Sequence, residues 1–584
     1  MPGITVEEFD VIVVGAGWNG LIAAYTYLQL APETKLLIVD NGRTIGGTWS
    51  KEKIYPNLYA QINTPKFEFS MWPMEPKGIS DDGYIPAKTV HDYLVSFAHE
   101  FRLAERTRLN TTVTKVHRAV DGKKWALTVD DGCDLVCAKL IYATGPTSNI
   151  IMPKWPQETF AKPIIHSQVM GEHLPQIAEN CRRTTVVGAA KSAFDTVYML
   201  VKAGQKVDWV MRDSPSGPLS LSAPTFIGLW STVDHVSTRM AASFSPSIMN
   251  TSGFWYNFLQ RSAPGLALTK LYWRVSTYLS SDHAQYDAND DMDKLRPQPY
   301  EYGMFWGSGG IGIASAPDFW KVLHSGDVTV RRGEIASFSH DNVVNLKDGH
   351  SFETDFVILC TGYDKGYLAF TPELRDQCGL YYDLHDEKSR WAAIDARADA
   401  VVDQKLPFLK SSAPEPPACG WTSKPSHGPN RHYRRLIVPE MAARDDRSIL
   451  FPGQIHSVFT SLTGEVQALW GAAYMLGYLD VPGQDEMELE AATFNAWTRK
   501  RYLEQGKKHA YFIYDYLSGW FANVNNEADA FLQYIDTLIR DLGLKVGRKG
   551  TMFAEQFEPY KPQDYKGLIR EYLDTREKKD RQVK

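Results

Sequence analysis

Val11-Ile12-Val13-Val14-Gly15-Ala16-Gly17-Trp18-Asn19-Gly20 is the stretch that decides the fold of this chain of 584 residues. Its four apolar β-branched residues are typical of a buried strand, and the apolar run Leu21-Ile22-Ala23-Ala24 begins a helix directly afterwards. The glycines have separate tasks: Gly15 permits the tight turn, Gly17 lets backbone amides approach a diphosphate, and Gly20 lets the helix pack against the strand. The stretch therefore predicts a Rossmann-type βαβ unit with a diphosphate at the helix N-terminus.

An acid at a fixed distance supports the same interpretation. Asp40 lies 20 residues after Gly20 and closes the next predicted strand, residues 36–39. At this spacing a carboxylate accepts a hydrogen bond from a ribose hydroxyl, so Asp40 is assigned to an adenosine ribose. A structural glycine turn is the alternative, but the strand, the helix and the acid together make it much the weaker one.

A second stretch, Thr185-Val186-Val187-Gly188-Ala189-Ala190-Lys191-Ser192-Ala193, repeats the pattern with alanine in place of two glycines. By itself it could be a structural turn. Lys191 and Arg212, which lies just beyond the predicted strand 207–211, favour a nucleotide, because cations near the ribose suit a 2′-phosphate. Two dinucleotides in one chain indicate a flavin that is reduced by a nicotinamide, so the predicted cofactors are FAD and NADPH. A further turn, Gly46-Gly47-Thr48-Trp49, is expected to hold the flavin end of FAD.

Short motifs continue along most of the chain. They are Asn63-Thr64, Ala143-Thr144-Gly145, Thr361-Gly362-Tyr363, Phe451-Pro452-Gly453 and Glu465-x-Gln467-Ala468-x-Trp470. Together with the glycine turns, they resemble the motifs of the class B flavin monooxygenases, which include the flavin-containing and the Baeyer–Villiger monooxygenases, and most of all the fungal members in secondary metabolism. The resemblance covers residues 11 to about 478. It implies that NADPH reduces FAD, that reduced FAD takes up O2, and that a C4a-(hydro)peroxyflavin transfers one oxygen atom to an organic substrate.

Two departures from the family pattern bear on the reaction. The linker signature is here Phe160-x-Lys162-x-x-x-His166 with Met170 at its last position, so the family's glycine and final aromatic residue are absent. Gln61 holds the position of an acid in the Baeyer–Villiger members, whereas Asn63-Thr64 resembles the amide segment of the heteroatom-oxidising members. We therefore expect oxygenation of a heteroatom or a carbon atom in a bulky substrate. Baeyer–Villiger oxidation of a ketone is the alternative, and a nucleotide-sensing protein without turnover is the third hypothesis.

The resemblance also supplies a catalytic candidate. The amide of Asn63 is expected near the reactive face of the flavin, where a donor stabilises developing peroxide charge; a structural turn is the alternative role. The predicted cofactor-binding residues are Gly15, Gly17, Trp18, Asn19, Gly20, Asp40, Gly47, Thr48, Trp49, Asn63, Thr64, Gly188, Ala190, Lys191, Ser192 and Arg212. No metal site is predicted, because His166 has no Cys, Asp or Glu at metal-ligand spacing and is better explained as a linker residue at a domain junction.

The order of the motifs predicts an α/β fold with two Rossmann-like dinucleotide-binding domains, the second inserted in the first. Two hairpin-to-strand exits match, since one strand ends at Thr144-Gly145 and another at Thr361-Gly362. The predicted segments are residues 1–165 (FAD-binding domain, first part), 166–340 (NADPH-binding domain, with a helical insert at about 214–312), 341–510 (FAD-binding domain, second part) and 511–584 (C-terminal helical extension).

The predicted insert is rich in large apolar side chains. They are Phe226, Trp230, Phe254, Trp255, Tyr256, Phe258, Tyr272, Trp273 and Tyr278. Such residues could line a pocket for a bulky substrate. A helical cap packed on the two domains, from which only some residues reach the substrate, is the favoured interpretation. Contact with a membrane surface is a third and weaker one.

Composition fits a cofactor-bearing enzyme and excludes other classes. With 43% hydrophobic residues the chain can bury a core large enough for two or three domains. The net charge of −6 argues against nucleic acid as a partner, and the basic runs 431–435 and 576–584 are expected to be a solvated loop and tail. Neither a signal peptide nor a membrane span is predicted. Six cysteines without C-x-x-C indicate a reducing, cytoplasmic location and argue against a disulfide reductase.

Overall fold

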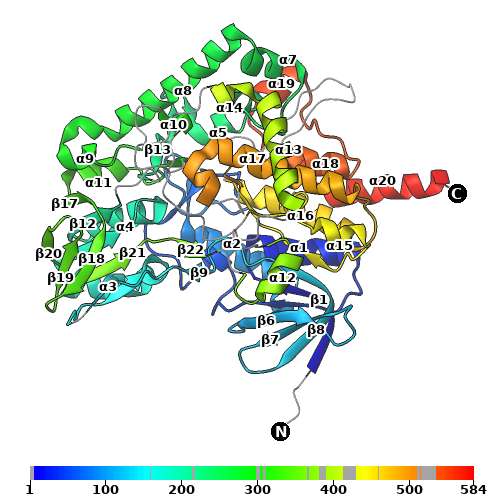
Figure 1. Cartoon of the computed structure of the whole chain (residues 1–584), viewed down its shortest axis with the longest axis horizontal. Helices are drawn as coiled ribbons and strands as arrows, with labels where there is room; N and C mark the ends of the chain where they lie inside the picture. Colours follow the sequence, from blue (N-terminus) through cyan, green and yellow to red (C-terminus); the bar gives the residue numbers. More distant parts are fainter. Residues whose placement is uncertain are drawn as a thin grey trace.

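The computed structural model describes residues 6–583 apart from residues 158, 213–216, 298–302, 307–310, 365–366, 381–389, 412–428, 458, 509–512 and 515–533. Within these residues the chain forms two main β-sheets, which lie side by side, and a large helical part above them (Figure 1). This arrangement confirms the predicted mixed α/β class.

The first sheet is built around the strand that opens the chain. β1 (Val6–Val14) pairs in parallel with β2 (Leu36–Val39) and with β8 (Asp134–Tyr142). Val11 and Val13 belong to a core that includes α1 (Trp18–Leu30), whereas Ile12 and Val14 belong to a second core on the other face. Because both faces are buried, the strand is a continuous apolar run rather than an alternating one.

The rest of this sheet comes from both early and late parts of the chain. Its order is β5-β2-β1-β8-β7-β6, with β5 at Thr107–Arg108, β6 at Val113–Arg118 and β7 at Trp125–Val129. The late strand β23 (Ile449–Leu450) pairs in parallel with β8, and α16 (Thr460–Met475) packs against α1. The chain therefore returns to its first sheet after residue 449.

The second sheet is entirely parallel. Its order is β10 (Ile164–His166), β21 (Phe356–Leu359), β11 (Arg183–Val187), β12 (Lys206–Met211) and β17 (Val328–Arg332). The predicted boundary at residue 340 is wrong in this respect, because β21 completes the second sheet and lies beyond it. The hairpin strands β19 (Val343–Leu346) and β20 (Ser351–Glu353) lead into β21, as β7 leads into β8.

The predicted helical insert lies between β12 and β17. Its main helices are α5 (Thr232–Val236), α6 (Arg239–Ser243), α7 (Gly253–Tyr256), α8 (Ala263–Ala284), α9 (Asp290–Asp293) and α10 (Gly303–Trp306). Short strands add to the helices: β13 (Ser220–Ser222) pairs with β16 (Ile311–Ile313), and β14 (Thr225–Phe226) pairs with β15 (Trp230–Ser231). Figure 1 shows α8 along the upper edge of the molecule.

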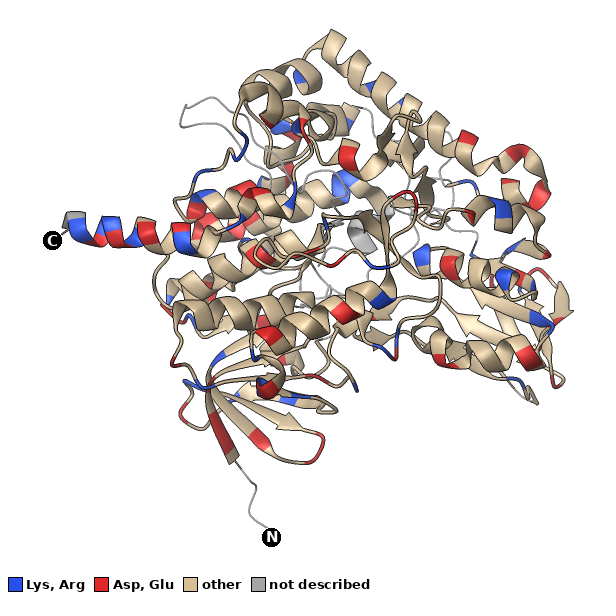
Figure 2. Ribbon diagram, turned by 180° about the vertical axis from the view of Figure 1, so that it is seen from behind, with Lys and Arg blue, Asp and Glu red and all other residues tan. Residues whose placement is uncertain are grey.

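The described residues from 534 onward in the predicted C-terminal extension form several helices. They include α18 (Tyr534–Asp541), α19 (Met552–Phe557) and α20 (Leu568–Val583). Buried Arg239 in the insert binds Asp536 of α18 through Nη1 at 3.0 Å and Glu555 of α19 through Nε at 2.7 Å. This ion-pair cluster connects the insert to the extension. Figure 2 shows α20 projecting from the body with alternating basic and acidic residues.

One basic run does not have the solvated position expected of it. Arg431 is 3% exposed and Arg435 is 1% exposed. Arg431 forms a two-point ion pair with Asp395, and Arg435 donates to the side chains of Asn430 and Asn495. The expectation of a solvated loop was wrong because acceptors distant in sequence compensate the buried cations.

Candidate functional site

Both predicted glycine turns lie at the start of a helix whose first turn is uncapped. α1 begins after Gly17, and α4 (Lys191–Lys202) begins after Ala190. Neither helix has a side-chain cap or an acid in its first turn. Because the first N–H groups of a helix have no intrahelical acceptor, such an end attracts an anion. Both helix starts therefore suit a nucleotide diphosphate.

The first turn is close-packed. Gly15 has a φ of +113°, and a Cβ there would lie 2.5 Å from the carbonyl oxygen of Ala143. A Cβ at Gly20 would overlap the carbonyl oxygen of Gly15, and a Cβ at Gly47 would lie 2.9 Å from the Cα of Gly17. Only glycine leaves room at these positions, so the two turns form one cradle of bare backbone.

A cleft of about 360 Å³ opens in front of α1. Its volume lies in the range of about 300 to 1,000 Å³ that small-molecule sites occupy. The predicted residues that line it are Gly15, Gly17, Trp18, Asn19, Asp40, Gly47, Thr48 and Trp49. Gly20, Asn63 and Thr64 are not among the lining residues. The uncapped helix and the glycine cradle fit the diphosphate of FAD.

Asp40 directly follows β2, and backbone N–H groups hold its carboxylate next to the first glycine turn. Its Oδ2 accepts the N–H of Ala16 at 2.6 Å, and its Oδ1 accepts the N–H of Gly42 at 2.7 Å. A carboxylate oxygen can accept more than one hydrogen bond. Asp40 can thus hold the turn closed and still accept from a ribose hydroxyl in the cleft that it lines.

Several lining residues were not predicted from the sequence. They are Lys53, Gln61, Phe67, Thr111, Thr112, Tyr142, Gly453, Ile455, Ser457 and Thr460. Among the described residues that line this cleft, Lys53 is the one Lys or Arg, and its ammonium group can attract a phosphate. A Cβ at Gly453 would lie 2.5 Å from Asn19 Nδ2, so this glycine admits the Asn19 side chain. The motif at 451–453 was the sequence signal that could have identified this wall.

The second turn repeats the backbone of the first. Gly188 has a φ of +140°, and a Cβ there would lie 2.4 Å from the carbonyl oxygen of Cys360, directly after β21. Ala190 is the N-cap position of α4, and Ser192 lies in its first turn. The likeness to the first turn extends to the neighbouring strand, because Cys360 stands where Ala143 stands in the first domain.

The two predicted phosphate-binding cations differ in their surroundings. Lys191 forms an ion pair with Asp195 one turn further along α4, and both side chains are largely buried. Arg212 is exposed directly after β12. Lys347, and more weakly Arg212, lower the pKa of Glu334. Arg212 is therefore the more accessible cation for a ribose 2′-phosphate.

Asn63 lies at the end of β3 (Tyr59–Asn63) and is 6% exposed. Its Nδ2 donates to Ser231 Oγ at 2.9 Å, and its Oδ1 accepts from Lys66 Nζ at 3.0 Å. Lys66 also pairs with Asp234 of the insert, and burial lowers the pKa of its ammonium group. The amide segment predicted to face the flavin therefore connects the first domain to the insert, and its Asn63 does not line the cleft in front of α1.

The insert encloses a second, apolar cavity. Of the nine large side chains predicted to form either a pocket or a cap, Phe226, Tyr272 and Trp273 line it. Trp230, Phe254 and Tyr278 are exposed by 55%, 65% and 66%. Some aromatic residues of the insert therefore line the cavity, whereas others lie on the surface of the insert.

Comparison with known proteins follows the same motifs. A family model described as pyridine nucleotide-disulphide oxidoreductase matches residues 12–241, which include both glycine turns. The FAD-dependent monooxygenase DEP4 of Alternaria brassicicola is 57% identical over 571 residues, covering 98% of this chain and 96% of the relative. The chain belongs to the FAD-dependent monooxygenases.

More distant relatives of this monooxygenase agree. The FAD-dependent monooxygenase rstn6 of Aspergillus nomiae is 36% identical over 595 residues, covering 98% of this chain and 99% of the relative. The open crystal structure of cyclohexanone monooxygenase has a TM-score of 0.55 at 15% identity, covering 86% of this chain and 96% of that one, which shows a shared fold. The predicted resemblance to the class B flavin monooxygenases, with fungal relatives, is confirmed.

Three further observations concern the described residues of the monooxygenase. The described cysteines, Cys133, Cys137, Cys181, Cys360 and Cys378, are free thiols. No group of three or more potential metal ligands occurs in the described part of the chain. None of the helices that the structure describes has the length and hydropathy needed to cross a membrane.

Proposed function

We propose that this chain is an NADPH-consuming monooxygenase that binds FAD at the first glycine turn and NADPH at the second, and inserts one oxygen atom from O2 into a bulky organic substrate of secondary metabolism. The observation that carries the proposal is the pair of uncapped helix starts, at α1 and α4, in one chain of this family. The strand order supports an NADPH-binding domain of about residues 166–360 inserted in the FAD-binding domain.

In the first domain, the N–H groups at the start of α1 and the glycine cradle would bind the diphosphate of FAD. Asp40 would accept from the adenosine ribose, and Gly47, Thr48 and Trp49 would contact the flavin end. When bound, FAD supplies the chemistry, since it takes up a hydride from NADPH and activates O2. The protein must position the substrate and keep water from the reacting atoms.

In the second domain, the start of α4 would bind the diphosphate of NADPH, with Gly188, Ala190 and Ser192 in contact with it. Arg212 would bind the 2′-phosphate. Lys191 would contribute less, because Asp195 already pairs with it.

Oxygenation of a heteroatom or carbon is favoured over conversion of a ketone to an ester. Gln61 lines the cofactor cleft at the position where the resemblance places an acid in the Baeyer–Villiger members. An amide is uncharged and has one acceptor oxygen, so Gln61 lacks the negative charge and the second acceptor oxygen of a carboxylate. Asn63 is proposed to stabilise charge near the flavin, either directly or by fixing the wall that it shares with the insert.

The test uses the purified full-length protein with its flavin. NADPH added without oxygen should bleach the visible flavin absorbance, and NADH should do so much more slowly. Labelled dioxygen and a panel of candidate pathway intermediates should then give one product with one labelled oxygen atom per NADPH consumed. A flavin that NADPH does not reduce would instead support the nucleotide-sensing alternative. Insertion of the label between a carbonyl carbon and its neighbour would support the Baeyer–Villiger alternative.

A further inference from the structure

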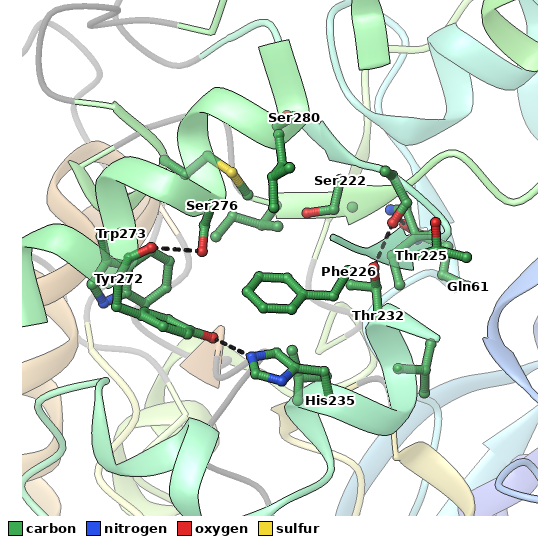
Figure 3. A pocket seen from close by; sticks show the side chains of 18 residues that line it. Gln61, Ser222, Thr225, Phe226, Thr232, His235, Tyr272, Trp273, Ser276 and Ser280 are labelled. Atoms are coloured by element: carbon green, nitrogen blue, oxygen red, sulfur yellow. Dashed lines mark hydrogen bonds between the residues drawn. The ribbon is translucent and has the colours of Figure 1, made fainter. Parts of the chain in front are cut away.

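An apolar cavity lies inside the insert, against the wall of the cofactor cleft. One face of α8 provides Tyr272, Trp273, Ser276, Leu279 and Ser280. Figure 3 labels all of these except Leu279, together with Phe226 and His235. The other walls come from α5, α10 and the short strands β13, β14 and β16. Gln61 is the contribution of the first domain, and it lines both this cavity and the cofactor cleft.

The hydroxyl groups around this cavity are largely satisfied by the protein itself. Ser276 Oγ donates to the carbonyl of Tyr272 at 3.0 Å, Ser280 Oγ to that of Leu221 at 2.8 Å, and Thr232 Oγ1 to that of Ala223 at 2.6 Å. None of the lining residues is Asp, Glu, Lys or Arg. The cavity therefore offers hydrocarbon contacts and no charge to a ligand.

His235 and Tyr272 form the polar pair at one side of the cavity. The Nε2 of His235 lies 3.0 Å from the Tyr272 hydroxyl, and the imidazole stacks on Phe226 with ring centres 4.0 Å apart (Figure 3). Burial lowers the pKa of His235 to about 4 and raises that of Tyr272, so both are neutral at pH 7. Within the described chain, His235 Nδ1 has no hydrogen-bond partner, so the pair can bind one more polar group.

Gln61 stands where the cavity meets the cofactor cleft. Its Oε1 accepts the N–H of Ile313 at 2.9 Å, which fixes the amide plane. No partner for its Nε2 is present among the described residues. A Cβ at Gly312 would lie 2.6 Å from Gln61 Oε1. The backbone of β16 can therefore approach the Gln61 side chain this closely because residue 312 is glycine.

We propose that this cavity binds the distal part of the substrate, and that its ligand is an uncharged, mainly hydrocarbon molecule with one hydroxyl or carbonyl oxygen held by the His235–Tyr272 pair. The reacting end of the same molecule extends past Gln61 to the flavin. This inference rests on the proposed function, because it specifies the substrate class of the same site. His235 and Tyr272 are specificity-determining residues in this assignment.

The experiment uses the FAD-bound full-length protein labelled with 5-fluorotryptophan. The ¹⁹F resonance of Trp273, which lines the cavity, is identified by its loss in Trp273→Phe. Titration with 1-decanol and with 2-decanone distinguishes a hydroxyl from a carbonyl ligand, and decanoate is the charged control. At least one uncharged probe should shift the Trp273 resonance and perturb the flavin absorbance, whereas decanoate should bind at least tenfold more weakly.

Two further variants test the geometry. Tyr272→Phe should weaken the uncharged probe about tenfold, because one buried hydrogen bond is lost. Ser276→Trp should fill the cavity and abolish the shift, while Val275→Trp, whose side chain points outward from the same helix, should leave it unchanged. Equal binding of decanoate, or an unchanged affinity in both Tyr272→Phe and Ser276→Trp, would overturn the assignment. Probe binding in a protein whose flavin NADPH cannot reduce would disprove the proposed function and leave the cavity assignment intact.

Discussion

The two glycine turns of this monooxygenase share their first position and differ at their third. Gly15 and Gly188 both have positive φ, and each faces the carbonyl oxygen of the residue directly after the neighbouring strand, Ala143 or Cys360. At the third position the first turn has Gly20, where a Cβ would overlap the carbonyl oxygen of Gly15. The second turn has Ala193, which is fully buried and accommodated.

The difference shows which part of the motif the fold itself requires. Contact between the turn and the neighbouring strand needs glycine in both domains, because positive φ and a close carbonyl exclude a side chain. The contact between helix and strand is adjustable, since the Cβ of buried Ala193 is accommodated in the second turn, whereas a Cβ at Gly20 would not be in the first. A degenerate motif therefore still gives a complete turn, and its loss of glycines does not mean loss of the nucleotide.

The largest expected effect comes from exchanging the third positions. Gly20→Ala should cost about 3 kcal/mol of stability and most of the bound FAD, because the Cβ overlaps backbone that cannot move independently. The matched change, Ala193→Gly, should cost only about 1 kcal/mol. Denaturant unfolding and the flavin-to-protein absorbance ratio measure both. A yellow Gly20→Ala protein of normal stability would contradict the close packing described for the first turn.

The second comparison concerns the residue after the second strand of each domain, Asp40 or Arg212. Arg212→Ala should weaken NADPH by about 2 kcal/mol and leave NADH nearly unchanged, since only NADPH offers a 2′-phosphate for charge-assisted hydrogen bonds. Initial rates of flavin reduction at varied coenzyme concentration give the two affinities. Equal weakening of both coenzymes would make Arg212 a structural residue.

Asn63 ends β3, the strand that follows Gly46-Gly47-Thr48-Trp49, and the proposal gives it a role in oxygen transfer. Asn63→Leu should cost about 1 to 2 kcal/mol, because Lys66 loses an acceptor and Ser231 loses a donor. Flavin binding and reduction should persist, while hydrogen peroxide rises and oxygenated product falls. Stopped-flow absorbance after mixing reduced protein with oxygen, together with peroxide assays, measures the change.

Ser231→Ala is the control, because it keeps the Asn63 amide and removes its hydrogen bond to the insert, together with the N-cap bond that Ser231 Oγ accepts from the N–H of Asp234. The same loss of product in Ser231→Ala would show that Asn63 acts by fixing the wall of the site. Unchanged product in both variants would assign Asn63 to a structural role alone.

The smallest effect is expected at Lys191. Lys191→Met should change NADPH affinity by about 0.5 kcal/mol or less, because Asp195 already pairs with the ammonium group and such helix pairs are worth little. The same reduction kinetics provide the measurement. A loss as large as that of Arg212→Ala would mean that Lys191 leaves Asp195 and binds the phosphate.

Local sequence determined the elements whose physics is local. The strand at residues 11–14, the glycine turns and the helix starts follow from φ preferences and apolar periodicity, so the α/β class and eight lining residues of the cofactor cleft could be predicted. The family resemblance was equally accessible, because its motifs are short and contiguous.

Only the tertiary structure decided features that join distant segments. Gln61 becomes a wall of two cavities because the insert packs against β3, and Arg431 and Arg435 are buried because partners elsewhere in the chain compensate them. β21 pairs with β11 although more than 160 residues separate the two strands, a pairing that no local pattern encodes. Packing and charge compensation depend on which surfaces meet, and that is fixed only when the whole chain has folded.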